Sequence, residues 1–137
     1  MVSTLTPQEI RLSLYNSDFY NVLMRMNTDI RWRTILVSQE PDLHLKDVEV
    51  LLRIFAMLID AQNYSPSMVK FLNQFSRKSQ THDEKQNLYL EQLFDSFLEA
   101  AQSLPKNAFL NKRNNRFNIA LIEAVFTAAC SKAFDEK

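Results

Sequence analysis

The sequence predicts an all-α protein that forms one domain around a central buried helix. The stretch from Asp47 to Asn63 is apolar on nearly every side of a helical wheel, as in a helix at the centre of a packed domain. The chain contains no glycine, although the favoured hairpin turns and phosphate-binding loops need glycine for positive φ or close backbone approach. These two observations argue against a β-rich fold and against a glycine-loop nucleotide site.

The central run does not predict a membrane span. It contains Arg53, has Lys46 and Asp60 at its flanks, and is shorter than the roughly 20 apolar residues that a bilayer requires. The length of 137 residues suits a single helical domain, residues 1–137, with one core. Basic and acidic residues balance at 16 each, which gives no overall attraction to nucleic acid but leaves a local basic patch open.

Helix-start signals and apolar spacing predict about seven helices, two of them short. The start signals are, in chain order, Thr6 to Glu9, Asn27 to Asp29, Ser65-Pro66 and Thr81 to Glu84. In the first helix, Ile10 and Leu14 share one face. A long amphipathic helix is expected to end before Pro105, and the last helix is expected over about residues 117–133.

Candidates for catalysis or metal binding are few. His44, His82 and Cys130 are far apart in the sequence and show no zinc-ligand spacing, so no metal and no cofactor are expected. Cys130 lies toward the apolar face of the last helix, where a thiol is usually an inert hydrophobic group. A lone cysteine also suits a reducing compartment, and the chain starts without an apolar signal segment, so a cytoplasmic location is expected. His82, next to a predicted helix cap, is expected on the surface. No acid, base and nucleophile are predicted together, and no catalytic residue is assigned.

Arg53 interrupts the most apolar run of the chain. Glu49 lies four residues earlier, in the favourable order for an ion pair within a helix. The preferred interpretation is a partly buried pair that fixes how the central helix packs. The alternative is an arginine directed at a phosphate or a neighbouring domain, because a charge in such a run is costly. Arg31 and Arg33 are expected to be exposed on either side of a buried Trp32.

A basic segment rich in asparagine precedes the last helix. Its cations are Lys106, Lys112, Arg113 and Arg116. Lysine and arginine beside amide side chains on a loop are groups that contact nucleic-acid phosphates. The other interpretation is a solvated loop without a ligand, which is the more frequent role of such charge runs.

Six short motifs follow one another along nearly the whole chain. They are LTPQEIR from Leu5, the segment from Asn27 to Trp32, LLRIFA from Leu51, MVKFLN from Met68, NAF from Asn107 and FNIALIEA from Phe117. In this order they resemble the helical C-terminal part of the GmrSD-type family, long catalogued as a domain of unknown function. Members of that family include restriction systems directed at modified phage DNA.

The resemblance implies a helical scaffold without catalytic residues of its own. In the family, this part follows a nuclease/NTPase-like module related to the ParB and sulfiredoxin folds, with an Asp-Gly-Gln-Gln-Arg motif tied to nucleotide hydrolysis. The glycine-free chain lacks that motif, and it also lacks a His-Asn-His nuclease segment. The resemblance therefore places Gln8, Glu9, Arg11 and Arg53 near the interface with a missing module, supplied in cis or in trans.

Two function hypotheses follow. The first is a non-catalytic helical domain of a GmrSD-like, modification-dependent restriction or phage-defence protein, present as a fragment or split half. It would support the nuclease module or contact DNA through the loop 106–116. The second is a stand-alone protein–protein interaction domain, with a homodimer as one form. The first predicts an uncovered apolar or charged patch near residues 7–11, and the second predicts that a symmetric contact closes it.

Overall fold

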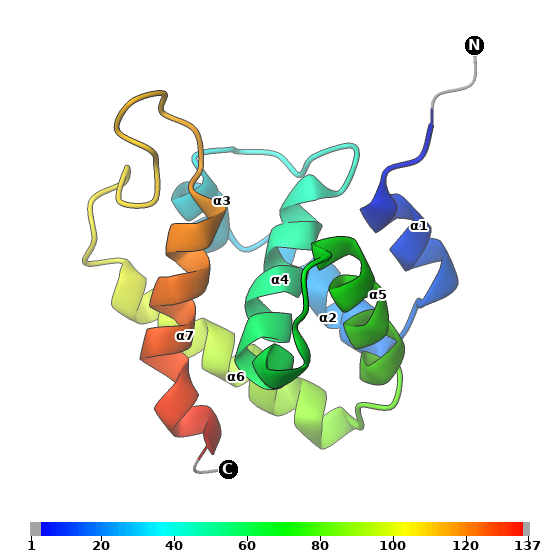
Figure 1. Cartoon of the computed structure of the whole chain (residues 1–137). Helices are drawn as coiled ribbons and strands as arrows, with labels where there is room; N and C mark the ends of the chain where they lie inside the picture. Colours follow the sequence, from blue (N-terminus) through cyan, green and yellow to red (C-terminus); the bar gives the residue numbers. More distant parts are fainter. Residues whose placement is uncertain (1–3, 136–137) are drawn as a thin grey trace.

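The structure is a computed structural model that describes residues 4–135, and these residues form an all-α fold (Figure 1). The helices are α1 (Pro7–Leu14), α2 (Asp18–Asn27), α3 (Ile30–Leu36), α4 (Lys46–Asp60), α5 (Met68–Ser79), α6 (Glu84–Ala101) and α7 (Ile119–Asp135), with a 3-10 turn, η1 (Ala61–Asn63), directly after α4. The predicted fold class is confirmed. Within the described range, the β pairing is one isolated bridge between Leu110 and Phe117. Of the helices in residues 4–135, none combines the length and apolar character needed to cross a bilayer.

α4 is the central helix that the apolar run predicts. It contacts α1, α2, α5 and α7, and Figure 1 shows it lying between α7 and α5. The fully buried Phe55 connects α4 to three helices, because its ring centroid lies 6.2 Å from that of Phe19 of α2, 6.0 Å from Phe94 of α6 and 5.3 Å from Phe126 of α7. Such aromatic pairs contribute roughly 0.5–1.5 kcal/mol each beyond their buried area. A helix that is apolar all round therefore has neighbours on most of its sides.

Capping side chains mark the starts of α1 and α6. The predicted box of α1 is present, since the Thr6 hydroxyl accepts the N–H of Glu9 at 3.2 Å and the Glu9 carboxylate accepts the N–H of Thr6 at 2.9 Å. The box of α6 begins at Asp83 with Gln86 as its partner, rather than at Thr81 as predicted. The Thr81 hydroxyl instead donates to a carbonyl in the last turn of α5, at 2.7 Å.

α1 turns its polar side toward the core. Gln8 and Arg11 are each only 1% exposed, whereas Ile10 is 44% and Leu14 is 63% exposed. Leu5 is 57% exposed and, with Ile10, occupies the two positions of a hydrophobic staple at the helix start. Leu5, Ile10 and Leu14 therefore form an uncovered apolar stripe along α1, which we call the α1 stripe.

Candidate functional site

The segment between α6 and α7, residues 102–118, is the basic loop. Its cationic side chains, all exposed, are Lys106, Lys112, Arg113 and Arg116. No acidic residue occurs between Glu99 and Glu123. None of the four cationic side chains makes a hydrogen bond or ion pair with a residue in 4–135. The loop therefore carries uncompensated positive charge on a protein whose total charge is zero.

The backbone at the tip of the basic loop is fixed by asparagine. The Asn111 side-chain oxygen accepts the N–H of Arg113 at 2.9 Å, and that of Asn114 accepts the N–H of Arg116 at 2.9 Å. The Asn111 N–H donates to the carbonyl of Arg116 at 2.7 Å, which closes the turn. Asn115 adopts a left-handed conformation, φ 58°, which asparagine tolerates better than most residues. The cations are thus presented from an ordered turn.

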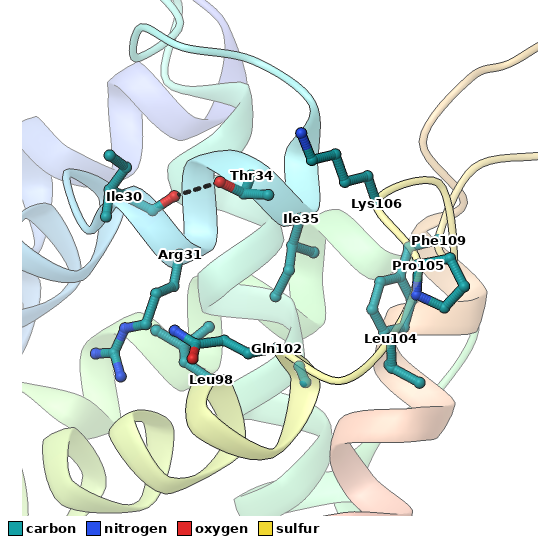
Figure 2. A pocket seen from close by; sticks show the side chains of 11 residues that line it. Ile30, Arg31, Thr34, Ile35, Leu98, Gln102, Leu104, Pro105, Lys106 and Phe109 are labelled. Atoms are coloured by element: carbon teal, nitrogen blue, oxygen red, sulfur yellow. Dashed lines mark hydrogen bonds between the residues drawn. The ribbon is translucent and has the colours of Figure 1, made fainter.

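A groove crosses the outer face of α3 beside the start of the basic loop, and Figure 2 shows the residues that line its smaller part. It consists of two hollows, of about 370 Å³ and about 710 Å³, which share Ile30, Thr34 and Lys106. The smaller hollow is mostly apolar and includes Leu104 and Phe109. Ile30 is 78% and Leu104 is 43% exposed, whereas Phe109 is buried. We call this surface the α3 groove; the sequence did not predict it, because helical periodicity does not show which faces stay uncovered.

Lys106 differs from the two arginines that line the α3 groove. The Arg31 guanidinium donates to Asp29 at 2.8 Å and to Asp95 at 2.6 Å, and these carboxylates hold the pKa of Arg31 above its ordinary value. Arg31 is thus partly buried and paired rather than exposed as predicted, while Trp32 is fully buried, as predicted. Among the charged lining residues, only Lys106 lacks a partner in the described part of the chain.

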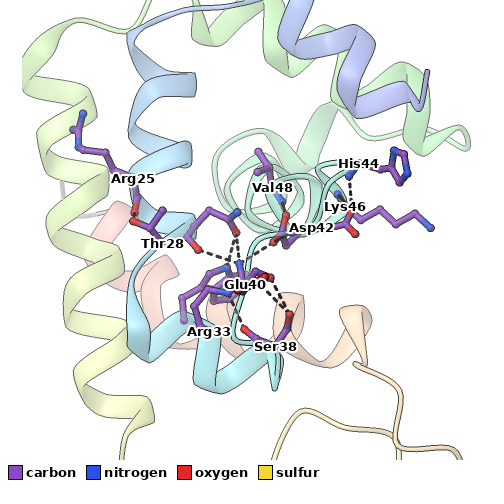
Figure 3. Close-up of polar contacts among 12 residues, drawn as sticks. Arg25, Thr28, Arg33, Ser38, Glu40, Asp42, His44, Lys46 and Val48 are labelled. Atoms are coloured by element: carbon purple, nitrogen blue, oxygen red, sulfur yellow. Dashed lines mark hydrogen bonds and ion pairs between the residues drawn. The ribbon is translucent and has the colours of Figure 1, made fainter. Parts of the chain in front are cut away.

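Arg33 is buried, which contradicts the prediction of an exposed side chain. Figure 3 shows the polar contacts that surround it. Its Nη1 donates to the carboxylate of Asp47 at 2.8 Å and to the carbonyl of Asn27 at 3.0 Å. Its Nε and Nη2 donate to the carbonyls of Ser38 at 2.9 Å and Glu40 at 2.8 Å. The guanidinium therefore joins α3, the following connector and the start of α4, and its charge is paired with the carboxylate of Asp47.

Arg11 also has an internal role. Its Nη1 donates to Glu49 of α4 at 2.8 Å and to Gln8 at 3.0 Å, and its Nε donates to Asn73 of α5 at 2.8 Å. Gln8 and Arg11 were expected at an interface with a second module, but both side chains are buried within the fold. Their burial has a physical reason, because the guanidinium is the polar link that joins three helices.

Arg53 pairs with Glu123 of α7, with 2.5 Å between Nε and Oε1. The predicted partner Glu49 was wrong, because Glu49 pairs with Arg11. The interpretation of a partly buried pair that fixes the packing of the central helix is correct in kind. Arg53 and Glu9 remain partly exposed, each with 23% of the side chain accessible, and their contact with a second module stays a prediction.

The nucleophile and acid–base candidates are held in apolar surroundings. Cys130 is 3% exposed, and burial raises the pKa of its thiol to about 11. His82, expected on the surface, is only partly exposed. Its ring is half-buried, 5.1 Å from the ring of Phe19 and 6.3 Å from that of Phe75, and burial lowers the pKa of His82. Among residues 4–135, no three metal-ligating side chains gather into a group that could hold an ion.

Comparisons of the chain with protein-family models, with curated proteins and with solved structures returned no match. The surfaces of the described residues that are open to a ligand or partner include the basic loop, the α3 groove and the α1 stripe.

Proposed function

We propose that this chain is a non-catalytic helical binding domain that contacts the nucleic-acid backbone through the tip of the basic loop. The observation that carries the proposal is the set of exposed, unpaired cations on an ordered turn with no acidic neighbour in the sequence. By contrast, the guanidinium groups of Arg11, Arg33 and Arg53 are used in ion pairs that hold helices together. Phosphate contacts from lysine and arginine are the main source of sequence-independent affinity for DNA.

The setting proposed for this activity is a cytoplasmic GmrSD-like restriction or phage-defence protein. A nuclease/NTPase-like module, in cis or in trans, would supply the chemistry. The α1 stripe supports this arrangement, because Leu5, Ile10 and Leu14 leave an apolar surface uncovered at the expected end of the domain. The proposed seat of the module is therefore the outward face of α1, together with Glu9, and not the buried Gln8 and Arg11.

Binding of a DNA duplex at two salt concentrations tests the proposal. A variant with Lys112, Arg113 and Arg116 all changed to alanine is compared with a matched variant in which Lys46, Lys70 and Lys85 become alanine. The control lysines are also exposed and unpaired within residues 4–135, and both variants lose the same charge. Each phosphate contact contributes about 0.9 to the slope of log affinity against log salt, so the loop variant should lose up to about 2.7 of that slope.

The two variants distinguish duplex binding through the loop tip from a general effect of positive charge on the protein. Fluorescence anisotropy with a labelled duplex at 50 mM and 200 mM salt gives both affinity and slope. The loop variant should bind much more weakly than the control variant. Equal loss in both variants, or no measurable binding by the unaltered protein, would refute contact through the loop tip.

The second candidate is a stand-alone interaction domain that forms a homodimer, and the same α1 stripe favours it. A symmetric contact between two stripes would bury Ile10 and Leu14 of each copy. Sedimentation of the unaltered protein and of a variant with Ile10→Ser and Leu14→Ser distinguishes the candidates. A dimer that the double substitution converts to a monomer supports this function, and a monomer at all concentrations removes it.

A further inference from the structure

The α3 groove combines an uncovered apolar surface with one unpaired positive charge. Ile30 at the first position of α3 is 78% exposed, and Leu104 across the groove is 43% exposed. Figure 2 shows Lys106 extending from the loop after α6 toward α3. Exposed apolar surface gathered in a hollow, with a polar rim, is a feature of protein interaction sites.

The shape of the groove suits a segment of polypeptide. The two hollows meet at Ile30, Thr34 and Lys106, so the groove continues along the exposed side of α3 from Leu104 to Val37. The smaller hollow, of about 370 Å³, offers space for a large aliphatic or aromatic side chain. An amphipathic helix commonly binds such a groove with apolar anchors spaced three or four residues apart.

The charges that line the groove indicate which charge a partner should carry. Arg31 already contacts two carboxylates, and Arg33 is buried against Asp47. The uncompensated charge among the lining residues within 4–135 is therefore the ammonium group of Lys106. Complementary potentials favour a negative group at this position.

We propose that the α3 groove binds an acidic amphipathic segment of a protein partner. One large apolar side chain of that segment lies in the smaller hollow, and a carboxylate contacts Nζ of Lys106. The proposal is independent of nucleic-acid contact, because Lys112, Arg113 and Arg116 do not line the groove. It also disfavours a nucleobase as the occupant, since the aromatic ring of the groove, Phe109, is 4% exposed and offers no face for stacking.

Three synthetic peptides test the proposal against the isolated chain. Each has 14 residues; the first has leucine at helical i, i+4 and i+7 positions with glutamate elsewhere, the second has lysine in place of glutamate, and the third has serine in place of leucine. Binding is followed by NMR of isotope-labelled isoleucine methyl groups and backbone amides. The glutamate–leucine peptide should shift the methyl signals of Ile30 and Ile35, and the serine peptide should not.

Substitutions on the rim give the second readout. Ile30→Ser should weaken the glutamate–leucine peptide at least fivefold, whereas Leu43→Ser, at a leucine that is 90% exposed outside the groove, should leave its affinity unchanged. Lys106→Glu should weaken the same peptide and strengthen binding of the lysine peptide, because the charge on the rim is reversed. The exposure of Ile30 and Lys106 makes both variants compatible with folding.

Several results would overturn the proposal. Absence of binding by the glutamate–leucine peptide would do so, and so would equal binding by the serine peptide. Shifts confined to amides 111–116 would show an acidic polymer on the loop tip instead of a peptide in the groove. A DNA duplex that shifts the Ile30 methyl signal would identify nucleic acid as the occupant. Failure of duplex binding at the loop tip leaves the peptide result unaffected, since the two are read from different residues.

Discussion

Arg11 of α1 and Glu49 of α4 form an ion pair, 2.8 Å between Nη1 and Oε2, although 38 residues separate them in the sequence. The guanidinium is 1% exposed and the carboxylate 33%. The same arginine also binds Asn73 of α5. The short helix α1 leaves Ile10 and Leu14 exposed, packs Leu12 against the core, and is joined to α4 and α5 by this buried guanidinium.

The first prediction concerns this attachment. Arg11→Met should lower the free energy of unfolding by about 3 kcal/mol, because it leaves the carboxylate of Glu49 and the amide of Asn73 without their donor. Urea unfolding measures the loss. Arg25→Ala removes an exposed pair with Glu91 and should cost less than about 1 kcal/mol. A similar small loss in the Arg11 variant would show that α1 is held by other contacts.

The second prediction concerns a valine in a conformation that glycine prefers. Val37 ends α3 with φ 55° and ψ 44°, and its N–H and that of Ser38 bond back to the carbonyls of Thr34 and Arg33, as in a Schellman motif. A left-handed conformation costs a residue with a Cβ roughly 1–2 kcal/mol. Because Val37 is 56% exposed, Val37→Gly should raise the free energy of unfolding by about 1 kcal/mol.

Val37→Ala is the matched control for this effect. It removes the same exposed methyl groups but keeps the Cβ, so it should give little or no gain. Thermal and urea unfolding of both variants measure the difference. A gain of equal size in Val37→Ala would place the effect in the side chain and not in the backbone conformation.

The third prediction is a pH dependence carried by His82. Burial lowers the pKa of His82 in the folded state, with Asn87 and Asp83 acting in the opposite direction. The unfolded chain therefore binds this proton at a higher pH than the folded chain. Stability should fall as the pH drops through the unfolded pKa near 6.5, by at most about 1.4 kcal/mol per pH unit, and level off below the folded pKa.

Urea unfolding between pH 7.5 and pH 5.5 measures this dependence above the range in which most carboxylates titrate. His82→Phe retains an aromatic ring against Phe19 and Phe75 and should flatten the profile. A profile with the same slope in His82→Phe would assign the dependence to another group.

The central helix was predictable because its residues are apolar on nearly every side, and a helix of that kind, too short and too charged to span a bilayer, is buried at the centre of a domain. The stretch from Asp47 to Asn63 corresponds to α4 and η1, with α4 starting one residue earlier. The capping box of Thr6 and Glu9 was equally readable, because its two hydrogen bonds join residues three positions apart. Interactions between residues that are close in the sequence can therefore be predicted from the sequence.

The buried arginines were not predictable by the same reasoning. Helical periodicity assigns the apolar side of a helix to the core, and in α1 this assignment is reversed by Arg11. The i, i+4 spacing of Glu49 and Arg53 favours a pair within the helix, but each side chain found a partner on another helix instead. Arg33 donates to Asp47 and to carbonyls of the connector. These acceptors do not lie at a regular helical spacing from Arg33, so the sequence pattern does not indicate them.

The last prediction tests whether order at the loop tip contributes to the proposed contact with nucleic acid. Changing Asn111 and Asn114 to alanine removes the two acceptors that fix the N–H groups of Arg113 and Arg116 but keeps every positive charge. Amide hydrogen exchange at residues 113 and 116 should become faster, and duplex affinity should fall about fivefold, or about 1 kcal/mol, because binding must then order the turn. Asn107→Ala, at an exposed asparagine of the same loop, serves as the control for loss of an amide. Unchanged exchange would contradict the asparagine turns, and faster exchange with unchanged affinity would show that the cations act without preorganisation.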